Sequence, residues 1–401
     1  MNLLRDKFVQ EIESGVLYGD HSLLSRRLMD LSEEFELDEE SKNKIFDIRK
    51  NYLTIELGEQ SEKTKSDINH HANEILNQFK SGSFTQKQGH RTEEAILNAE
   101  SISKQFTQGR NPFYLQPIDL TLKSGEITGV VGENGNGKTT LLRILAGELS
   151  TDSGKIDFPK LNVNANDWYA IKNKIAFIPQ RIPKWQGTLL DNLRFFATIH
   201  NIKGKANDER IDYILYRLGL DKYRDLKWSE ISSGYRLRFE LAKMLLWKPE
   251  LLILDEPLSN LDINAQQLFL QDLKFFTLSE AHPMSIILSS QNLHEIEKIA
   301  DNIIFIRQGV TIYNGPQKLF ALERSHNSFE ISGNFNLEQL TACFKDLPNI
   351  NVENAGTSYI ISTGTDITIY FLTEILHKNK IELNYIRNIS QSTRKLFHKD
   401  I

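Results

Sequence analysis

The chain has 401 residues, of which 40% are apolar and 25% are charged, so two or three domains of ordinary composition are expected. Its net charge of −5 argues against nucleic-acid binding, because no basic excess is available to neutralise phosphates. The single cysteine, Cys343, excludes an internal disulfide and fits a reducing compartment. The sequence contains no apolar run near the roughly 20 residues that cross a bilayer, and its start does not resemble a signal peptide. If the protein acts at a membrane, we therefore expect another chain to cross it.

Residues 1–80 are predicted to form a helical accessory domain. Apolar side chains recur at helical spacing over 3–16 and again over 23–35. Asp38 is a candidate cap for a third helix, and residues 67–79 predict a fourth. No pattern of catalytic or binding residues is visible here, so we expect this domain to pack or dock against another part of the molecule.

The remainder of the chain divides by composition. Residues 81–93 are polar and rich in Gly, Ser and Gln, and they are expected to form a linker. Over 94–324, strand-like apolar runs alternate with helical patterns, which predicts an α/β domain with a largely parallel sheet. Residues 325–401 show short elements in the order βαββαβ, which is typical of a small ferredoxin-like α+β domain.

A glycine-rich stretch at 132–139, Gly-Glu-Asn-Gly-Asn-Gly-Lys-Thr, has the spacing of a phosphate-binding loop. A strand-like run precedes it and a helical pattern follows it, as such a loop requires. Glycines let backbone N–H groups turn toward phosphate oxygens, and the helix N-terminus adds a positive dipole end. Lys138 offers a charge to the terminal phosphates, and the Thr139 hydroxyl can ligate Mg²⁺. The expected nucleotide-binding residues are Gly132, Asn134, Gly135, Asn136, Gly137, Lys138, Thr139 and Thr140.

The second candidate motif is an apolar run that ends in two carboxylates, Leu-Leu-Ile-Leu-Asp-Glu-Pro at 251–257. A buried parallel strand delivers the residues at its carboxyl end to the nucleotide crevice. Asp255 is therefore expected to hold Mg²⁺, directly or through water, and Glu256 to orient and polarise the attacking water. The alternative is that both acids only cap the following helix.

In their order, these motifs resemble the ATP-binding-cassette (ABC) ATPases over residues 96–324, whose fold is a P-loop NTPase cassette with a helical subdomain. The two motifs match the family's Walker A and Walker B motifs. The resemblance implies that Gln180, in a Q-loop, senses Mg²⁺ and the attacking water. It also implies that Ser259 and Asp262 belong to a D-loop at a dimer interface. Phe106 stands where the family stacks an aromatic ring on adenine, the alternative being an ordinary core residue at a strand end.

The family signature is altered in this chain. It usually reads Leu-Ser-Gly-Gly-Gln, whereas residues 231–236 read Ile-Ser-Ser-Gly-Tyr-Arg. A predicted helix begins here, and its N–H groups can still meet a γ-phosphate on an opposite subunit. By resemblance, Ser232, Ser233 and Gly234 therefore form an altered but usable signature.

The position of the family's switch histidine, after the strand that follows Walker B, is occupied by Gln291. Glutamine can donate a hydrogen bond to a γ-phosphate but carries no charge, so we expect hydrolysis through Glu256 to be slow. His294 lies further along, and we expect it on the surface of a helix.

The resemblance implies an ATP hydrolase with ATP and Mg²⁺ as cofactors. Family sites form between two cassettes and this chain has one, so a homodimer or a pairing with a second ATPase chain is expected. The leading hypothesis is a cytoplasmic subunit at the inner face of the membrane that powers a separate transmembrane permease. Residues 181–187 would then lie near the permease.

The direction of transport is inferred from two stretches of sequence that resemble exporters. The signature variant and the end of the chain, 386–397, resemble exporter ATPases, which favours export. The alternative is a soluble regulatory or signalling ABC ATPase without a permease, supported by the N-terminal helices and the missing histidine.

Overall fold

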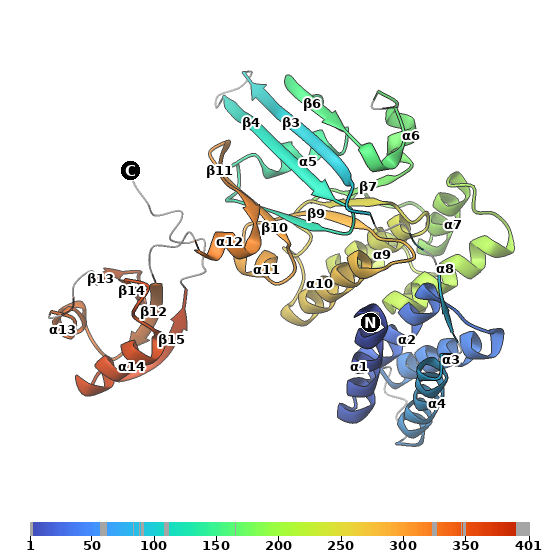
Figure 1. Cartoon of the computed structure of the whole chain (residues 1–401), viewed down its shortest axis with the longest axis horizontal. Helices are drawn as coiled ribbons and strands as arrows, with labels where there is room; N and C mark the ends of the chain where they lie inside the picture. Colours follow the sequence, from blue (N-terminus) through green and yellow to red (C-terminus); the bar gives the residue numbers. More distant parts are fainter. Residues whose placement is uncertain are drawn as a thin grey trace.

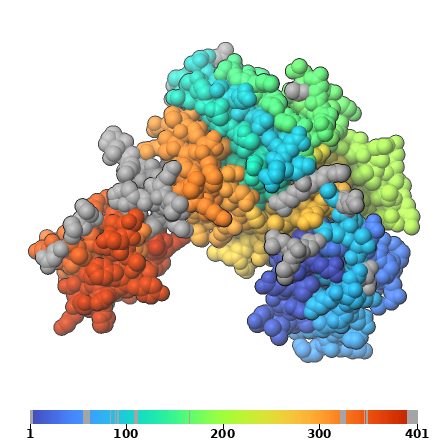
Figure 2. Space-filling model, in the orientation of Figure 1, coloured from blue at the N-terminus to red at the C-terminus, as the bar shows by residue number. Residues whose placement is uncertain are grey.

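The chain forms an N-terminal helical unit, a central α/β unit and a C-terminal unit that projects as a separate lobe (Figure 1, Figure 2). The computed structural model describes residues 3–56, 62–82, 84–87, 89, 92–107, 112–164, 166–322, 327–345, 347 and 350–389. Residues 390–397, in the part of the chain that resembles exporter tails, lie outside the described residues. Within these ranges no helix combines the length and the apolar character needed to cross a bilayer.

The N-terminal unit is built from α1 (Leu3–Tyr18), α2 (His21–Glu34), α3 (Glu39–Glu56) and α4 (Glu62–Lys80). The cap predicted for the third helix is confirmed, because the Asp38 carboxylate accepts a hydrogen bond from the Ser41 N–H at 2.7 Å. Aromatic rings fill the core between the helices. Phe35 and Phe79 meet edge to face, with ring centroids 4.8 Å apart, and Phe8 packs against both.

The first part of the expected linker packs against these helices. Phe84 is buried in their apolar core, and β2 (Thr85–Gln86) pairs antiparallel with β1 (Phe35–Glu36). The segment is thus attached to the helical unit by one buried apolar side chain together with a short strand pair. Residues 83, 88, 90 and 91 of the same segment lie outside the described part of the chain.

The central unit contains the predicted parallel sheet. Its strands are β5 (Ile127–Val131), β7 (Ile175–Ile178), β8 (Leu251–Leu254), β9 (Ser285–Ser290), β10 (Asn302–Arg307) and β11 (Val310–Pro316). In the described residues the order is β11-β10-β5-β9-β8-β7, and only the β10–β11 pair is antiparallel. The parallel strands β5, β8 and β9 are buried along their whole length, which explains the apolar run of β8 and means that the serines of β9 need hydrogen-bond partners.

A second, antiparallel sheet is made of β4 (Phe113–Lys123), β3 (Ala95–Phe106) and β6 (Ser153–Asp157). Helix α5 (Lys138–Leu145) shares one apolar cluster with this sheet and with the parallel sheet. The opposite face of the parallel sheet packs on α9 (Ser233–Leu245), α10 (Ile263–Leu278) and α11 (Leu293–Glu297). Helices α7 (Leu189–Ile199) and α8 (Lys205–Leu218) complete a helical subdomain with α9. The short helices α6 (Trp168–Lys172) and α12 (Gln317–Leu322) lie at the periphery (Figure 1).

The C-terminal unit has the predicted element order. Its elements are β12 (Asn327–Gly333), α13 (Leu337–Ala342), β13 (Asn351–Asn354), β14 (Tyr359–Thr363), α14 (Ile369–Lys378) and β15 (Leu383–Asn388). The antiparallel sheet runs β13-β14-β12-β15, which confirms the ferredoxin-like α+β arrangement.

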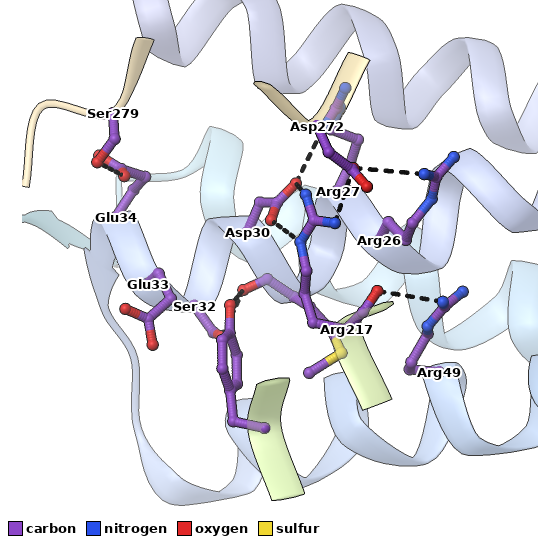
Figure 3. Close-up of polar contacts among 12 residues, drawn as sticks. Arg26, Arg27, Asp30, Ser32, Glu33, Glu34, Arg49, Arg217, Asp272 and Ser279 are labelled. Atoms are coloured by element: carbon purple, nitrogen blue, oxygen red, sulfur yellow. Dashed lines mark hydrogen bonds and ion pairs between the residues drawn. The ribbon is translucent and has the colours of Figure 1, made fainter. Parts of the chain in front are cut away.

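A buried ion network joins the N-terminal unit to the central unit (Figure 3). The Arg217 guanidinium on α8 donates to Asp30 on α2 and to Asp272 on α10, each at 2.7 Å. Arg27 also donates to Asp30, at 2.8 Å. Burial acts to raise the pKa of Asp272, but the Arg217 and Arg26 guanidiniums outweigh it and hold that pKa below its ordinary value. The network therefore attaches α2 to both the helical subdomain and α10.

Two glutamates at the end of α2 extend this attachment. The Glu34 carboxylate accepts hydrogen bonds from the Ser279 hydroxyl and from the backbone N–H groups of Glu280 and Ala281. Glu33 pairs with Arg210 at 3.1 Å and with Lys248 at 3.0 Å. Burial raises the pKa of Glu34 above its ordinary value despite these donors, so the contact holds a carboxylate in an unfavourable environment.

Replacing Arg217 with leucine should destabilise the docked N-terminal unit by about 3–5 kcal/mol, because Asp30 and Asp272 would keep their charges without their main partner. Urea unfolding followed by fluorescence measures this loss. Lys205→Gln is the control, since it removes an exposed pair with Glu209 and should change stability by less than about 1 kcal/mol. An Arg217→Leu variant as stable as the unmodified protein would show that the network does not hold the units together.

Candidate active site

The phosphate-binding loop lies between β5 and α5, and two of its glycines have backbone conformations that favour glycine. Gly135 and Gly137 have φ angles of 82° and 103°. A Cβ atom added at Gly137 would lie 2.8 Å from the Phe113 ring, and one added at Gly132 would lie 2.4 Å from the Ile306 carbonyl oxygen. The loop therefore packs closely against neighbouring strands. A larger residue at Gly132 or Gly137 would push the loop away from them.

Lys138 is buried at the start of α5, with 4% of its surface exposed. Its Nζ donates to the carbonyl oxygens of Gly132 at 2.7 Å and Glu133 at 3.1 Å. It also lies 3.0 Å from Glu256 Oε1, in an ion pair. The ammonium group is thus held inside the curve of the loop, where the terminal phosphates of a nucleotide are expected. Thr140 follows in the first turn of α5 and is half-buried.

The two predicted acids stand at the carboxyl end of β8. Asp255 Oδ2 accepts a hydrogen bond from the Thr139 hydroxyl at 2.8 Å, so the two expected Mg²⁺ ligands are neighbours. Glu256 is also buried and adopts a φ of 46°, in the left-handed region that non-glycine residues rarely occupy. Such backbone strain is typical of functional sites, because the surrounding fold must hold it in place.

Two amide side chains converge on the Glu256 carboxylate. Gln180 Nε2 donates to Glu256 Oε2 at 3.3 Å, and Gln291 Nε2 donates to the same oxygen at 2.8 Å. Both amides are exposed, so they face the open side of the site. The structure thus brings together four side chains that sequence reasoning had selected, Lys138 and Glu256 included. His294 lies exposed on α11, as expected for a helix surface residue.

Oxygen ligands suited to Mg²⁺ gather beside the phosphate loop. The Thr139 hydroxyl and the Asp255 carboxylate are adjacent, and the amide of Gln180 lies at the same edge of the sheet. Mg²⁺ is commonly bound by one or two such protein oxygens together with substrate phosphates and waters. The donor set therefore fits a nucleotide-bound magnesium ion.

Ser289 is a site residue that sequence reasoning missed. This fully buried serine on β9 donates to Asp255 Oδ1 at 2.7 Å and accepts a hydrogen bond from the Glu256 N–H at 2.8 Å. It therefore fixes both acids relative to the neighbouring strand. The sequence offered one signal for it. A serine in a strand that is predicted to be buried needs a hydrogen-bond partner, and the acids of the neighbouring strand could supply one.

Asn136 and the turn between β10 and β11 form a second missed contact. The buried Asn136 side chain accepts a hydrogen bond from the Gln308 N–H at 3.0 Å, and its carbonyl accepts one from Gly309 at 3.3 Å. Asn134 is exposed. The two asparagines of the loop thus differ in role. The Asn136 side chain holds the loop against the turn between β10 and β11, whereas that of Asn134 faces solvent.

Phe106 stands at the end of β3, with 38% of its surface exposed. Its ring lies 6.5 Å from that of Phe113 across the strand pair. Phe113 is the closer of the two to the phosphate loop, because its ring tip approaches Gly137. Either ring could offer a face to a base, and spacing along the sequence could not distinguish them.

The altered signature and the D-loop lie against each other. Ser232 caps α9, accepting a hydrogen bond from the Tyr235 N–H at 3.5 Å, and the Ser233 hydroxyl donates to the Asn260 carbonyl at 3.5 Å. A Cβ atom added at Gly234 would lie 3.2 Å from the Leu261 side chain. The predicted helix start is therefore confirmed, and Ser232 and Ser233 are exposed on it.

The D-loop joins this surface to the acids. The Ser259 hydroxyl donates to the Glu256 carbonyl at 3.0 Å. Asp262 caps α10 by accepting a hydrogen bond from the Ala265 N–H at 2.9 Å. The backbone of Glu256 is thus connected through a short turn to the segment that contacts the signature.

Comparison with known proteins agrees with this geometry. A family model described as ABC transporter matches residues 115–259. An uncharacterized ABC transporter ATP-binding protein of Bacillus subtilis, YdbJ, is 33% identical over 218 residues, covering 54% of this chain and 68% of the relative. The spermidine/putrescine import ATP-binding protein PotA of Fusobacterium nucleatum is 27% identical over 319 residues, covering 75% and 81%. The structure of CbiO1 from Clostridium perfringens, part of the transporter complex CbiONQ, shares the fold with a TM-score of 0.51 at 24% identity, over 64% of this chain and 97% of that one.

Replacing Ser289 with alanine should lower the rate of ATP hydrolysis by about tenfold to a hundredfold, because Asp255 and Glu256 each lose a hydrogen bond that positions them. Ser285→Ala is the matched control. Ser285 is a buried serine at the other end of β9, and its hydroxyl contacts the backbone of Gly125 and Lys123. Steady-state ATPase kinetics and thermal unfolding should be measured for both variants. Equal rate losses in the two would mean that Ser289 acts only through stability.

Proposed function

The chain belongs to the ATP-binding proteins of ABC transporters, whose cassettes hydrolyse ATP, and we propose that it powers a transporter whose membrane-spanning permease is a separate chain. The observation that carries the proposal is the meeting of Lys138, Gln180 and Gln291 at one carboxylate, Glu256. These contacts support the proposal, because a cation suited to phosphate, a carboxylate suited to water and two neutral hydrogen-bond donors lie together.

Each of these residues has a separate task in the proposed reaction. Lys138 binds the terminal phosphates, and Glu256 orients the attacking water and accepts its proton. Thr139 and Asp255 would hold Mg²⁺, and the ion would supply positive charge to neutralise the phosphate oxygens. Gln291 donates a hydrogen bond without carrying charge, and we therefore propose that hydrolysis is slow.

The signature completes the site from another cassette. Ser232 and Ser233 are exposed at the start of α9, and the sequence contains one phosphate loop. A helix start is suited to bind a phosphate group on an opposing surface. We therefore propose a homodimer, or a pair with a second ATPase chain, in which ATP lies between the phosphate loop of one cassette and the signature of the other.

The proposed permease contact lies beside the Q-loop. In residues 181–187, which follow Gln180, Trp185 is buried and Ile182 half-buried, whereas the other side chains are exposed. Helix α7 follows this segment and carries two large exposed apolar side chains, Phe195 at 62% and Ile199 at 58% exposure. Exposed apolar side chains close together favour a protein contact. The signature variant and the resemblance of residues 386–397 to exporter ATPases support export, whereas the relative PotA is named for import.

Glu256→Gln is expected to accumulate a dimer on size exclusion in the presence of ATP and Mg²⁺. Glutamine keeps the size of the side chain but cannot accept the proton of water, so ATP would stay bound between the two cassettes. The same variant without nucleotide should elute as the unmodified protein does. A strictly monomeric variant under ATP would contradict the proposed shared site.

Charged substitution at the α7 surface should separate the ATPase from its permease. We expect Phe195→Glu with Ile199→Glu to abolish co-purification of a membrane protein in mild detergent, as identified by mass spectrometry. Tyr169→Glu is the control, because Tyr169 is an aromatic side chain exposed at 83% on a different helix, α6. If no membrane protein co-purifies with the unmodified chain, a regulatory ATPase that works without a permease is favoured instead.

A further inference from the structure

A cavity of about 230 Å³ lies where the N-terminal unit meets the helical subdomain, outside the ATP site. It is walled by α2, α3, the corner after α8, α9 and α10. Its lining is strongly cationic, with Arg26, Arg49, Lys222 and Arg238. Among the described residues that line it, Asp272 is the one carboxylate. The cavity is therefore a concentrated positive surface shared by two units of the chain.

The first cation, Arg26, is buried with 6% of its surface exposed. Its Nη1 reaches Asp272 Oδ1 at 3.4 Å, but the same oxygen is already bound by Arg217 at 2.7 Å. Burial lowers the pKa of Arg26, Asp272 raises it by less, and nearby arginines lower it further, so the pKa lies below its ordinary value. The positive charge of this guanidinium is therefore only partly balanced inside the protein.

The other cations surround the same space. Arg49 is 3% exposed and donates to Ser25 Oγ and to the carbonyl oxygens of Tyr216 and Arg217. Figure 3 shows Arg26 and Arg49 on the same side of the ion network, away from Glu34 and Ser279.

Lys222 and Arg238 are the more accessible cations of the wall. Lys222 is exposed next to the ring of Tyr223, and Arg238 is half-buried over the ring of Tyr235. Over the part of the chain that the structure describes, neither of them forms an ion pair. Their charges are therefore available to a ligand, and both belong to the central unit rather than to the N-terminal helices.

We propose that this cavity binds a small phosphate-bearing anion. Guanidinium groups match phosphate oxygens with paired hydrogen bonds, and buried arginines lose less on ordering than mobile surface lysines. Sites for drug-sized ligands are typically about 300–1,000 Å³ in volume. The cavity is smaller than that range, so it suits inorganic phosphate, pyrophosphate or the phosphate end of a small ester rather than a whole nucleotide.

An anion in this position contacts both units at once. Arg26 belongs to α2, whereas Tyr235 and Arg238 belong to α9, the helix that begins at the exposed signature serines. Binding therefore links the N-terminal unit to the helix that carries the signature, and gives that unit a means to respond to a phosphate compound. This inference concerns a site separate from the phosphate loop and does not depend on a permease.

The test is calorimetric titration of inorganic pyrophosphate into the full-length protein, in metal-free buffer with saturating ADP. ADP occupies the phosphate loop, so a second site appears as binding without ADP release, which a fluorescent ADP analogue monitors. We expect one pyrophosphate to bind per chain, at least tenfold more tightly than malonate, a carboxylate dianion. Affinity should fall as NaCl is raised from about 50 to 500 mM, because salt screens charge attraction.

Variants of the accessible cations identify the site. Lys222→Gln with Arg238→Gln should weaken pyrophosphate binding at least tenfold and lower the thermal midpoint only slightly, since neither side chain forms an ion pair and each loses a contact with one aromatic ring. Lys203→Gln with Lys205→Gln removes the same charge from exposed positions of the helical subdomain and should not alter binding. Binding only by displacement of ADP, or binding equally weakened in both double variants, would overturn the proposal. Tighter binding of malonate than of pyrophosphate would overturn the phosphate assignment.

Discussion

Parallel pairing of β5, β9 and β8 is the constraint on which the site depends. The carboxyl ends of parallel strands meet at one edge of a sheet, so the phosphate loop after β5, the acids after β8 and Gln291 after β9 become neighbours. Because these strands are buried along their whole length, a ligand can reach residues at their ends but not residues within them. The packing that holds the sheet together therefore also sets the distances among the residues of the site.

Glu256 is the residue on which the contacts set by strand pairing converge. Its backbone has a positive φ, and its carboxylate is contacted by Lys138 from the phosphate loop and by two amides from neighbouring segments. Ser289 anchors its N–H to the next strand. A strained residue persists only where its surroundings over-determine it, and the contacts from separate strands supply that condition here.

The N-terminal unit is attached by charge as well as by apolar packing. Phe8 and Phe275 meet edge to face across the boundary, with centroids 5.7 Å apart, but the buried arginines and aspartates beside them determine orientation. Arg217 contacts two acids on different elements, so its geometry specifies how α2 sits on α8 and α10. Such a network leaves cations such as Arg26 only partly balanced, which explains why a positive cavity forms beside it.

Short stretches of sequence were sufficient to predict the phosphate loop, the two acids, the Q-loop glutamine, the helical unit and the βαββαβ order of the C-terminal unit. These features depend on glycine spacing, apolar periodicity and motif order, which act over short stretches of chain. The residues that support these features became apparent from the folded chain. The Ser289 hydrogen bonds, the Asn136–Gln308 contact and the pairing of the Phe106 and Phe113 rings depend on contacts between distant segments. The same is true of three further features: the antiparallel sheet of β3, β4 and β6, the attachment of Phe84 and the Arg217 network. In each of them, burial or ion pairing joins residues that are far apart along the chain, and local sequence patterns do not reveal such contacts.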